Sequence, residues 1–372
     1  MKKTNKTYKE IESIEEFLDN GWSFINCCFQ DIDFRVLPIR WDRIHLENCT
    51  FLGCKFHKKD INLLLLKNTL IFPAVNHIPY NPYRKSLYTW QELYNKSSHE
   101  NAVTIDEEIY YHFSHYRYQN DITEALYQRI HDHSIDDALY EILGNRKDGS
   151  FQKKAVGIMG GHGTKRSSPF YKKVAEVSFI LSKKGYLIVS GGGPGIMEAA
   201  NLGAYMANYS KPELSTALEI IDGNISYNHP EYFKTALEVL NNFPHGKENL
   251  AIPTWFYGHE PSNLFASHIA KYFSNSIRED TLLAIALHGI VFAPGSAGTN
   301  QEIFMDLSQN HYQTFGYYSP MVFLGKKHYV EETKIFPVIK NFVENNPYQD
   351  MLFVEDDVYK ICKFIEKNPP KK

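Results

Sequence analysis

Two glycine-rich loops stand where the residue types and their spacing could support chemistry. Residues 191–195 read Gly-Gly-Gly-Pro-Gly, and residues 294–298 read Pro-Gly-Ser-Ala-Gly. Small residues allow a bulky anion to approach the backbone. A helix that begins after such a loop directs free N–H groups and the positive end of its dipole at the same point. Each loop therefore predicts a phosphate site.

A carboxylate follows each of these loops. Glu198 lies in the first turn of a helix predicted over residues 196–208. Glu302 lies in the first turn of a helix predicted over residues 300–309, with Thr299 as its N-cap. A carboxylate in this place is expected to face the ligand that its loop binds. Two such loops in one chain predict the two walls of a single nucleotide cleft. For Glu198, stabilisation of its own helix through the dipole is an equal alternative.

The elements around these loops alternate between strand and helix. A third loop, residues 160–164, follows an apolar run at 155–159 and precedes a helical pattern at 169–184. The other apolar runs that predict strands are residues 186–190, 217–221, 250–252, 290–293, 321–324 and 351–354. This alternation predicts an α/β fold with a doubly wound, Rossmann-like parallel sheet covered on both faces. Ligands of such sheets bind at the carboxyl ends of the strands, where all three loops lie.

The chain before this sheet has a different character. Phe24, Phe29 and Phe34 recur at intervals of five residues, and so do Leu46, Phe51 and Phe56. This spacing resembles pentapeptide-repeat coils, although two fragments are too few for a long solenoid. We expect an N-terminal extension that is β-rich and then helical, with a short helix at residues 10–20.

Three domains follow from these patterns. Residues 1–85 form a small Cys- and Phe-rich cap that ends in a Pro-rich linker, residues 86–150 form a helical segment packed on the core, and residues 151–372 form the Rossmann-like domain.

Composition excludes several classes of partner. The net charge of −3 gives no electrostatic reason to expect nucleic-acid or membrane binding. The first ten residues are charged and lack an apolar core, so we expect no signal peptide. The five cysteines are odd in number and lack paired metal spacing, which predicts reduced thiols in a cytoplasmic protein.

The spacing of the cysteines and histidines gives little support for a metal site. Cys27, Cys28, Cys49 and Cys54 are interpreted as small buried apolar residues rather than zinc ligands. The histidines between positions 112 and 133 are interpreted as structural or surface residues, because no HExxH-type carboxylate accompanies them. We predict no metal and no organic cofactor.

The paired motifs resemble those of the LOG (Lonely Guy) family of phosphoribohydrolases and of the related bacterial nucleotide 5′-monophosphate nucleosidases. The family pattern is approximately GGGxxGxM followed by PGGxGTxxE. The chain has SGGGPGIMEAANLGA from Ser190 and PGSAGTNQE from Pro294, with Ser296 in place of a glycine. The resemblance covers residues 154–329, under half of the chain. It implies a LOG-type fold and a homodimer or higher homo-oligomer.

The resemblance also implies an activity and the residues that perform it. A nucleoside 5′-monophosphate such as AMP would be hydrolysed at its N-glycosidic bond to a free base and ribose 5-phosphate. Glu302 and Arg278 are the implied catalytic residues. Arg278 lies one residue further from Pro294 than is usual in the family, and a surface ion pair with Asp280 is the alternative for it. The residues predicted to bind phosphate or nucleotide are Gly160, Gly161, Thr164, Gly191, Gly192, Gly193, Gly195, Glu198, Asn263, Pro294, Gly295, Ser296, Ala297, Gly298 and Thr299.

Two further interpretations stay open. Asn263 could contact the base, although capping of a following helix is favoured. The departures at Ser296 and Arg278 motivate a second hypothesis, a non-catalytic nucleotide sensor or carrier of the LOG-like superfamily. The GxGxxG fingerprint and the Walker A sequence are both absent, which argues against a dinucleotide oxidoreductase and an NTPase.

Overall fold

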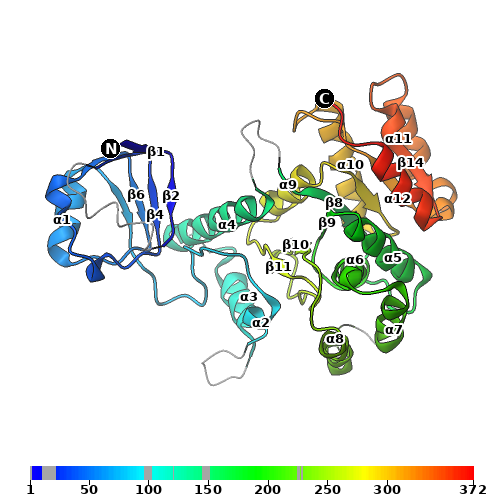
Figure 1. Cartoon of the computed structure of the whole chain (residues 1–372), viewed down its shortest axis with the longest axis horizontal. Coiled ribbons are helices and arrows are strands. Elements are labelled where there is room, and N and C mark those ends of the chain that lie inside the picture. The colour runs from blue at the N-terminus through cyan, green and yellow to red at the C-terminus, as the bar shows by residue number, and fades with distance from the viewer. Residues whose placement is uncertain are drawn as a thin grey trace. The chain divides into compact units, whose positions relative to one another are not determined.

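The computed structural model describes residues 2–10, 22–95, 103–119, 121–144, 151–223, 227 and 229–372. The chain forms two compact units, one made of Met1–Leu87 with Glu108–Leu139 and the other of Tyr88–Glu107 with Tyr140–Lys372 (Figure 1). The segment predicted as one helical domain at residues 86–150 is thus divided between the units. The helix predicted at residues 10–20 lies outside the described residues, and the three predicted domains stay a prediction.

The first unit begins with short parallel strands. One sheet has the order β1-β3-β5 and the other the order β2-β4-β6-β7. The strands are β1 Lys2–Thr4, β2 Thr7–Tyr8, β3 Ser23–Ile25, β4 Cys28–Gln30, β5 His45–Glu47, β6 Thr50–Leu52 and β7 Leu70–Phe72. Asn26, Asp31 and Asn48 turn the chain after strands with φ near 50°, a region that Asn and Asp tolerate. The predicted β-rich start of the chain is confirmed.

The five-residue aromatic spacing becomes a stacked column inside this unit. Phe29 lies opposite Phe51 in the parallel register, and their rings stack at 4.8 Å between centroids. Phe34 stacks on Phe56 at 5.2 Å in the same way. The column is closed by buried Trp41. Each coil of chain therefore buries its apolar residues against the next coil, and Leu64 joins the same core.

Helices complete the N-terminal part of the chain. They are α1 Lys58–Leu66, α2 Trp90–Leu93, α3 Ile105–Tyr116 and α4 Ile122–Leu143. Short helical turns elsewhere are Phe34–Val36, Trp41–Arg43, Met206–Asn208, Lys327–Glu332 and Gln349–Met351. None of the helices in the described ranges has both the length and the apolar character needed to cross a membrane.

The second unit contains a seven-stranded, fully parallel sheet of order β11-β10-β9-β8-β12-β13-β14. The strands are β8 Lys154–Met159, β9 Tyr186–Ser190, β10 Leu250–Ala251, β11 His268–Ile269, β12 Ile290–Phe292, β13 Met321–Leu324 and β14 Leu352–Glu355. The order reverses between β8 and β12, which is the switch point of a doubly wound sheet. The predicted Rossmann-like α/β fold is confirmed.

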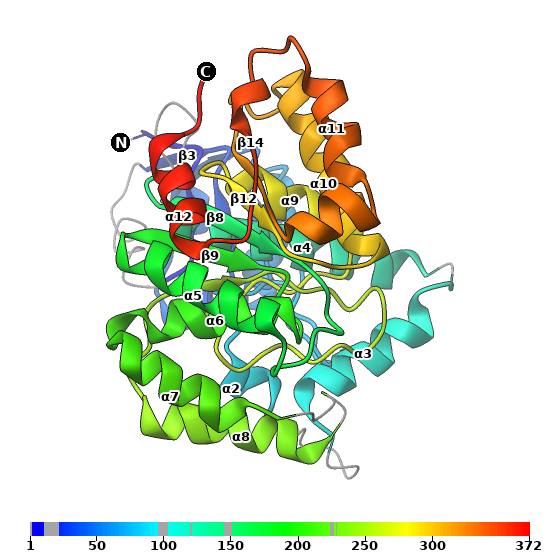
Figure 2. The same ribbon diagram turned by 90° about the vertical axis from the view of Figure 1, so that its right-hand side faces the viewer.

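Helices cover both faces of this sheet. They are α5 Pro169–Lys183, α6 Ile196–Tyr205, α7 Lys211–Ile221, α8 Pro230–Asn242, α9 Asn275–Ile285, α10 Ala297–Tyr312, α11 Ile335–Val343 and α12 Val358–Lys367. Figure 2 shows α5, α6 and α12 on one side of the sheet and α9, α10 and α11 on the other. Two contacts mark that second face. Ala286, directly after α9, lies against Gly157, and the ring of Phe336 on α11 lies 5.4 Å from that of Phe323.

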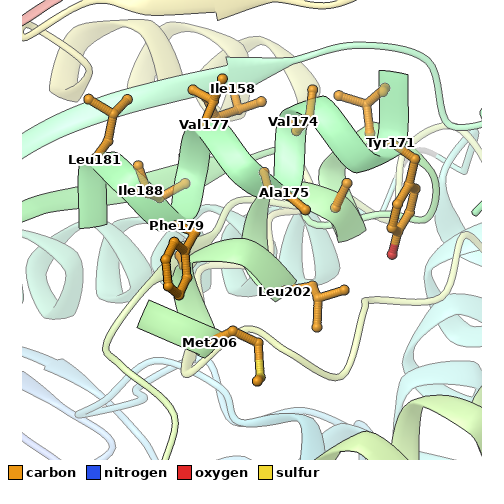
Figure 3. Close-up of a cluster of buried hydrophobic side chains, with 14 of the residues drawn as sticks. Ile158, Tyr171, Val174, Ala175, Val177, Phe179, Leu181, Ile188, Leu202 and Met206 are labelled. Carbon is orange, nitrogen blue, oxygen red and sulfur yellow. The ribbon is translucent and has the colours of Figure 1, made fainter. Parts of the chain in front are cut away.

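Alternate residues of the strands build the core on the first face. Ile158 and Ile188 of the sheet meet Val177 and Leu181 of α5, and Phe179 of α5 faces the α6 side (Figure 3). All of these side chains are almost completely buried. A strand presents every second residue to one face, so the same strands serve both helical layers.

One predicted strand is wrong. Residues 217–221 belong to α7, which begins with a capping box between Ser210 and Glu213. Leu214, Ala217 and Ile221 are its buried residues, at the three- and four-residue spacing of a helix face. A five-residue segment with four apolar side chains cannot by itself distinguish a strand from a buried helix turn. The short strand β11 was not predicted.

Replacing Phe29 with Ala should destabilise the first unit by about 3–5 kcal/mol, the usual cost of removing a buried aromatic ring. Phe29 is completely buried and stacks on both Phe51 and Tyr8. Hydrogen exchange measured by mass spectrometry should show faster exchange across β2, β4 and β6. Val36→Ala, at a side chain that is 65% exposed, is the control. Unchanged exchange in the Phe29 variant would contradict the role of the aromatic column.

Candidate functional site

Three loops meet at the switch point of the sheet. They follow β8, β9 and β12, and β8 pairs with both of the other strands. The Gly161 N–H donates to the carbonyl of Pro294 at 3.1 Å, and the Ile196 N–H donates to the carbonyl of Gly161 at 3.2 Å. The loop after β8 is therefore bonded to both of its neighbours through its backbone.

Glycine is required where these loops touch. Gly195 has φ of 68°, and a Cβ there would lie 2.5 Å from the carbonyl oxygen of Gly161. A Cβ on Gly191 would lie 2.5 Å from the Arg278 guanidinium. Any side chain at either position would force the loops apart or displace Arg278.

A buried amide network fixes the loop after β9. Asn263 donates through its side chain to the carbonyl of Gly192 at 3.0 Å and to Asn201 at 2.8 Å. Asn201 in turn donates to Asn249 at 2.8 Å and accepts from Ser190 at 2.7 Å. Asn263 precedes no helix, so the predicted capping role is wrong. Its amide holds the glycine loop instead.

Glu198 is part of a buried ion pair. Its carboxylate accepts two hydrogen bonds from Arg166, at 2.6 and 2.8 Å. It also accepts from the hydroxyls of Tyr171 and Tyr232, at 2.8 and 2.7 Å. Only 1% of Glu198 is exposed. These four hydrogen bonds give the Glu198 carboxylate a structural role, and its partners are Arg166 and two tyrosines rather than the helix dipole alone.

A cavity of about 510 Å³ opens beside the loops. Its volume is within the range of about 300–1,000 Å³ that is usual for small-molecule sites. The lining residues come from all three loops, from α6, α9 and α10, from the segment after β10, and from Tyr227. They are Gly160, Gly161, His162, Gly191, Met197, Tyr227, Thr254, Tyr257, Gly258, His259, Glu260, Arg278, Glu279, Ser296, Ala297, Gly298, Thr299, Gln301 and Glu302.

Arg278 and Glu302 face each other in this cavity. Arg278 Nη1 lies 3.5 Å from Glu302 Oε1, and both side chains are about one-tenth exposed. Arg278 Nε donates to the carbonyl of Ile252 at 2.8 Å, which fixes the guanidinium. Glu279 accepts from Gln301 at 2.7 Å and lines the same cavity.

The charge of Glu302 depends on these neighbours. Burial raises the pKa of Glu302 from its ordinary value of 4.5 to about 7, and Glu279 also raises it, whereas Arg278 lowers it. The carboxyl group therefore changes its protonation near neutral pH, where a group that exchanges protons with substrate or water works best.

The helix after β12 begins earlier than predicted. α10 starts at Ala297 with Ser296 as its N-cap residue, so Thr299 lies inside the helix and Glu302 lies in the second turn. The first N–H groups of a helix lack partners within it. A Cβ built on Gly298 has no heavy atom within 4 Å. The helix start is therefore open to a ligand.

The predicted site residues divide into two groups. Those that line the cavity are Gly160, Gly161, Gly191, Arg278, Ser296, Ala297, Gly298, Thr299 and Glu302. Those outside the lining are Thr164, Gly192, Gly193, Gly195, Glu198, Asn263, Pro294 and Gly295. Members of the second group bond or pack behind the loops. Thr164, for example, closes the first loop by donating its N–H to Gly161.

Several lining residues were not predicted. Tyr257, His259 and Glu260 come from the segment after β10, which lacks a glycine motif of the kind that marked the other loops. The signal in this segment is the stretch Glu260-Pro261-Ser262-Asn263, which resembles an EPxN stretch in the nucleosidases, but only its Asn263 was predicted as a site residue. In the described part of the chain, no group of three or more His, Cys, Asp or Glu side chains is placed to hold a metal ion.

Comparison with known proteins supports the LOG-like assignment for part of this unit. Residues 153–209 match the model of the SLOG cluster4 family, and this segment holds the loops after β8 and β9. The predicted resemblance is confirmed over these residues. No curated protein is similar to this chain in sequence.

The solved structures that match part of this chain include two proteins described by their molybdenum cofactor. The molybdenum cofactor binding protein from Rippkaea orientalis has 13% identity and a TM-score of 0.38, and the match covers 59% of this chain and 98% of that chain. The molybdenum cofactor carrier protein from Chlamydomonas reinhardtii has 14% identity and a TM-score of 0.37, with 58% and 98% covered. Similarity at this level carries no conclusion about a ligand.

Replacing Glu279 with Gln should lower the pKa of Glu302 below about 7, because it removes a negative charge that raises this pKa. Arg278→Met should shift the pKa in the opposite direction. Carbon-13 NMR of labelled glutamate carboxyl groups would measure both shifts without any assay of activity. A Glu302 pKa that does not change in either variant would contradict this electrostatic arrangement.

Proposed function

We propose that this chain is a phosphoribohydrolase that cleaves the N-glycosidic bond of a nucleoside 5′-monophosphate. The observation that carries the proposal is the facing pair of Glu302 and Arg278, which lines one cavity together with the open start of α10. The reaction needs an anchor for the 5′-phosphate and a carboxylate near the sugar carbon. Both are available within this cavity.

The start of α10 is the proposed phosphate anchor. Ser296, Ala297 and Gly298 line the cavity and are exposed there. Their position at the N-terminus of a long helix provides free N–H groups and a favourable dipole for an anion. Arg278 supplies the positive charge that the glycine loops lack.

Glu302 is the proposed catalytic carboxylate. As the bond between C1′ and the base breaks, positive charge develops on the sugar, and a nearby carboxylate stabilises it. Glu302 can also accept a proton from the water that adds to C1′. Because its pKa is raised to about 7, the ionised form needed for both tasks is gained as the pH rises through neutrality.

The second candidate function is a nucleotide sensor or carrier with the same cavity. Ser296 favours it, because this residue replaces a glycine of the enzymatic motif and lies in the cavity wall. Incubation with a panel of nucleoside 5′-monophosphates distinguishes the two functions. Release of free base supports the hydrolase, and a ligand-induced rise in melting temperature without turnover supports the sensor.

A cytoplasmic location is part of the proposal. All five cysteines are thiols outside disulfide bonds, and Cys27, Cys49, Cys54 and Cys362 are buried. Reduced thiols are typical of cytoplasmic proteins. The homodimer that the family resemblance implies stays a prediction.

Glu302→Gln should reduce turnover by about hundredfold or more, the usual effect of losing a main electrostatic stabiliser. Glutamine keeps the shape of the side chain and loses its charge, so ligand binding should persist. Glu344→Gln changes an exposed carboxylate at the end of α11 and is the matched control. Turnover close to that of the wild type in the Glu302 variant would overturn the assigned mechanism.

Gly298→Val should raise KM for a nucleoside 5′-monophosphate by about tenfold or more, a loss of about 1.4 kcal/mol of binding. The space around Gly298 is open, so the fold tolerates the side chain while the phosphate does not. Gly298→Ala should give a smaller increase in KM. Binding of the matching free nucleoside, followed by calorimetry, should change little in both variants. Equal losses for nucleotide and nucleoside would show that this helix start does not hold the phosphate.

A further inference from the structure

A buried polar cluster lies behind one wall of the cavity. Its centre is Asp106, a residue of α3 that belongs to the second unit and is completely buried. Lys271 Nζ lies 2.8 Å from this carboxylate, and the Trp255 indole N–H donates to it at 2.9 Å. His259 Nε2 lies 3.3 Å from Oδ2 of Asp106.

This cluster keeps the Asp106 carboxylate ionised and fixed. Burial raises its pKa, but Lys271 and His259 outweigh burial and lower the pKa below the ordinary value. Lys271 is itself completely buried and also donates to the hydroxyl of Ser262 at 3.3 Å. A carboxylate that is held on several sides orients a neighbouring imidazole without moving.

His259 connects the cluster to the cavity. Its side chain is 26% exposed and lines the same cavity as Glu302 and Arg278. The segment that carries His259 is anchored, because the backbone N–H of Trp255 donates to the carbonyl of Tyr272 at 3.0 Å. The imidazole therefore combines a fixed carboxylate partner with access to a ligand.

We propose that His259, oriented by Asp106, donates the proton that the departing base requires. This inference rests on the proposed phosphoribohydrolase function and adds a catalytic residue to it. A carboxylate held close to one ring nitrogen of a histidine sets the orientation of the imidazole. A histidine that lines a ligand cavity and has a fixed carboxylate behind it is placed to give a proton to a leaving group.

The proposed step gives one proton to the base and removes one proton from water. The bond between C1′ and the base nitrogen breaks, and its electron pair goes to the base. His259 gives a proton to a ring nitrogen of the base, while water adds to C1′ and gives a proton to the Glu302 carboxylate. Glu302 then releases that proton and His259 takes one up. The net reaction converts nucleotide and water into free base and ribose 5-phosphate.

The test compares two leaving groups. The substrates are AMP or GMP, whichever the wild type hydrolyses faster, and the N7-methyl form of the same nucleotide. A methylated purine already carries a positive charge and leaves as a neutral base without a proton donor. His259→Gln should reduce kcat on the ordinary nucleotide by about hundredfold, within the usual range for general acid catalysis, and by less than about threefold on the methylated one.

Controls separate this role from a structural one. His268→Gln, at a partly exposed histidine that pairs with Glu248 outside the cavity, should leave both substrates unaffected. Glu302→Gln should slow both substrates, because the sugar develops positive charge with either base. Equal loss on both substrates in His259→Gln, or no loss on either, overturns the inference while the proposed function stands. A wild type that releases no free base from any nucleoside 5′-monophosphate of the panel overturns the function and the inference together.

Discussion

The contact of three backbone loops at the switch point of the sheet is the constraint on which the site depends. Gly161 bonds to the loops on both sides of it, so the position of each loop is set by the other two. A side chain is excluded from the contact at Gly195, because a Cβ there would lie 2.5 Å from the carbonyl oxygen of Gly161. The polar groups that a ligand meets there are consequently supplied by backbone N–H groups and by side chains that reach in from elsewhere.

Two glutamates that follow equivalent loops have opposite environments because of this arrangement. Glu198 points behind its loop, where Arg166 and two tyrosine hydroxyls satisfy it fully. Glu302 points into the cavity, where Arg278 contacts it at 3.5 Å and burial weakens its acidity. The first carboxylate holds the architecture together. The second keeps the capacity to exchange a proton, which supports its proposed part in catalysis.

The sequence was sufficient for features that depend on local pattern. The parallel sheet, the three glycine loops and the aromatic column at Phe29 all follow from spacing and turn residues. Pairings between distant residues were not accessible. The partner of Glu198 is Arg166, and the proposed role of His259 depends on Asp106, which lies far earlier in the chain. The start of α10 was placed too late because Thr299 is a good N-cap, whereas the loop closes sooner, at Ser296.

The buried pair of Asp106 and Lys271 limits where this chain could be shortened. A recombinant fragment that begins at residue 151 would retain the entire seven-stranded sheet, yet Lys271 would lose its carboxylate. Removal of one partner from a buried ion pair costs about 3–5 kcal/mol, a large share of the about 5–15 kcal/mol that stabilises a typical domain. Such a fragment would also lose Tyr88, which exchanges two backbone hydrogen bonds with Ile269 on the edge strand β11. An uncovered edge promotes aggregation, so the smallest soluble form of this sheet should begin before Tyr88.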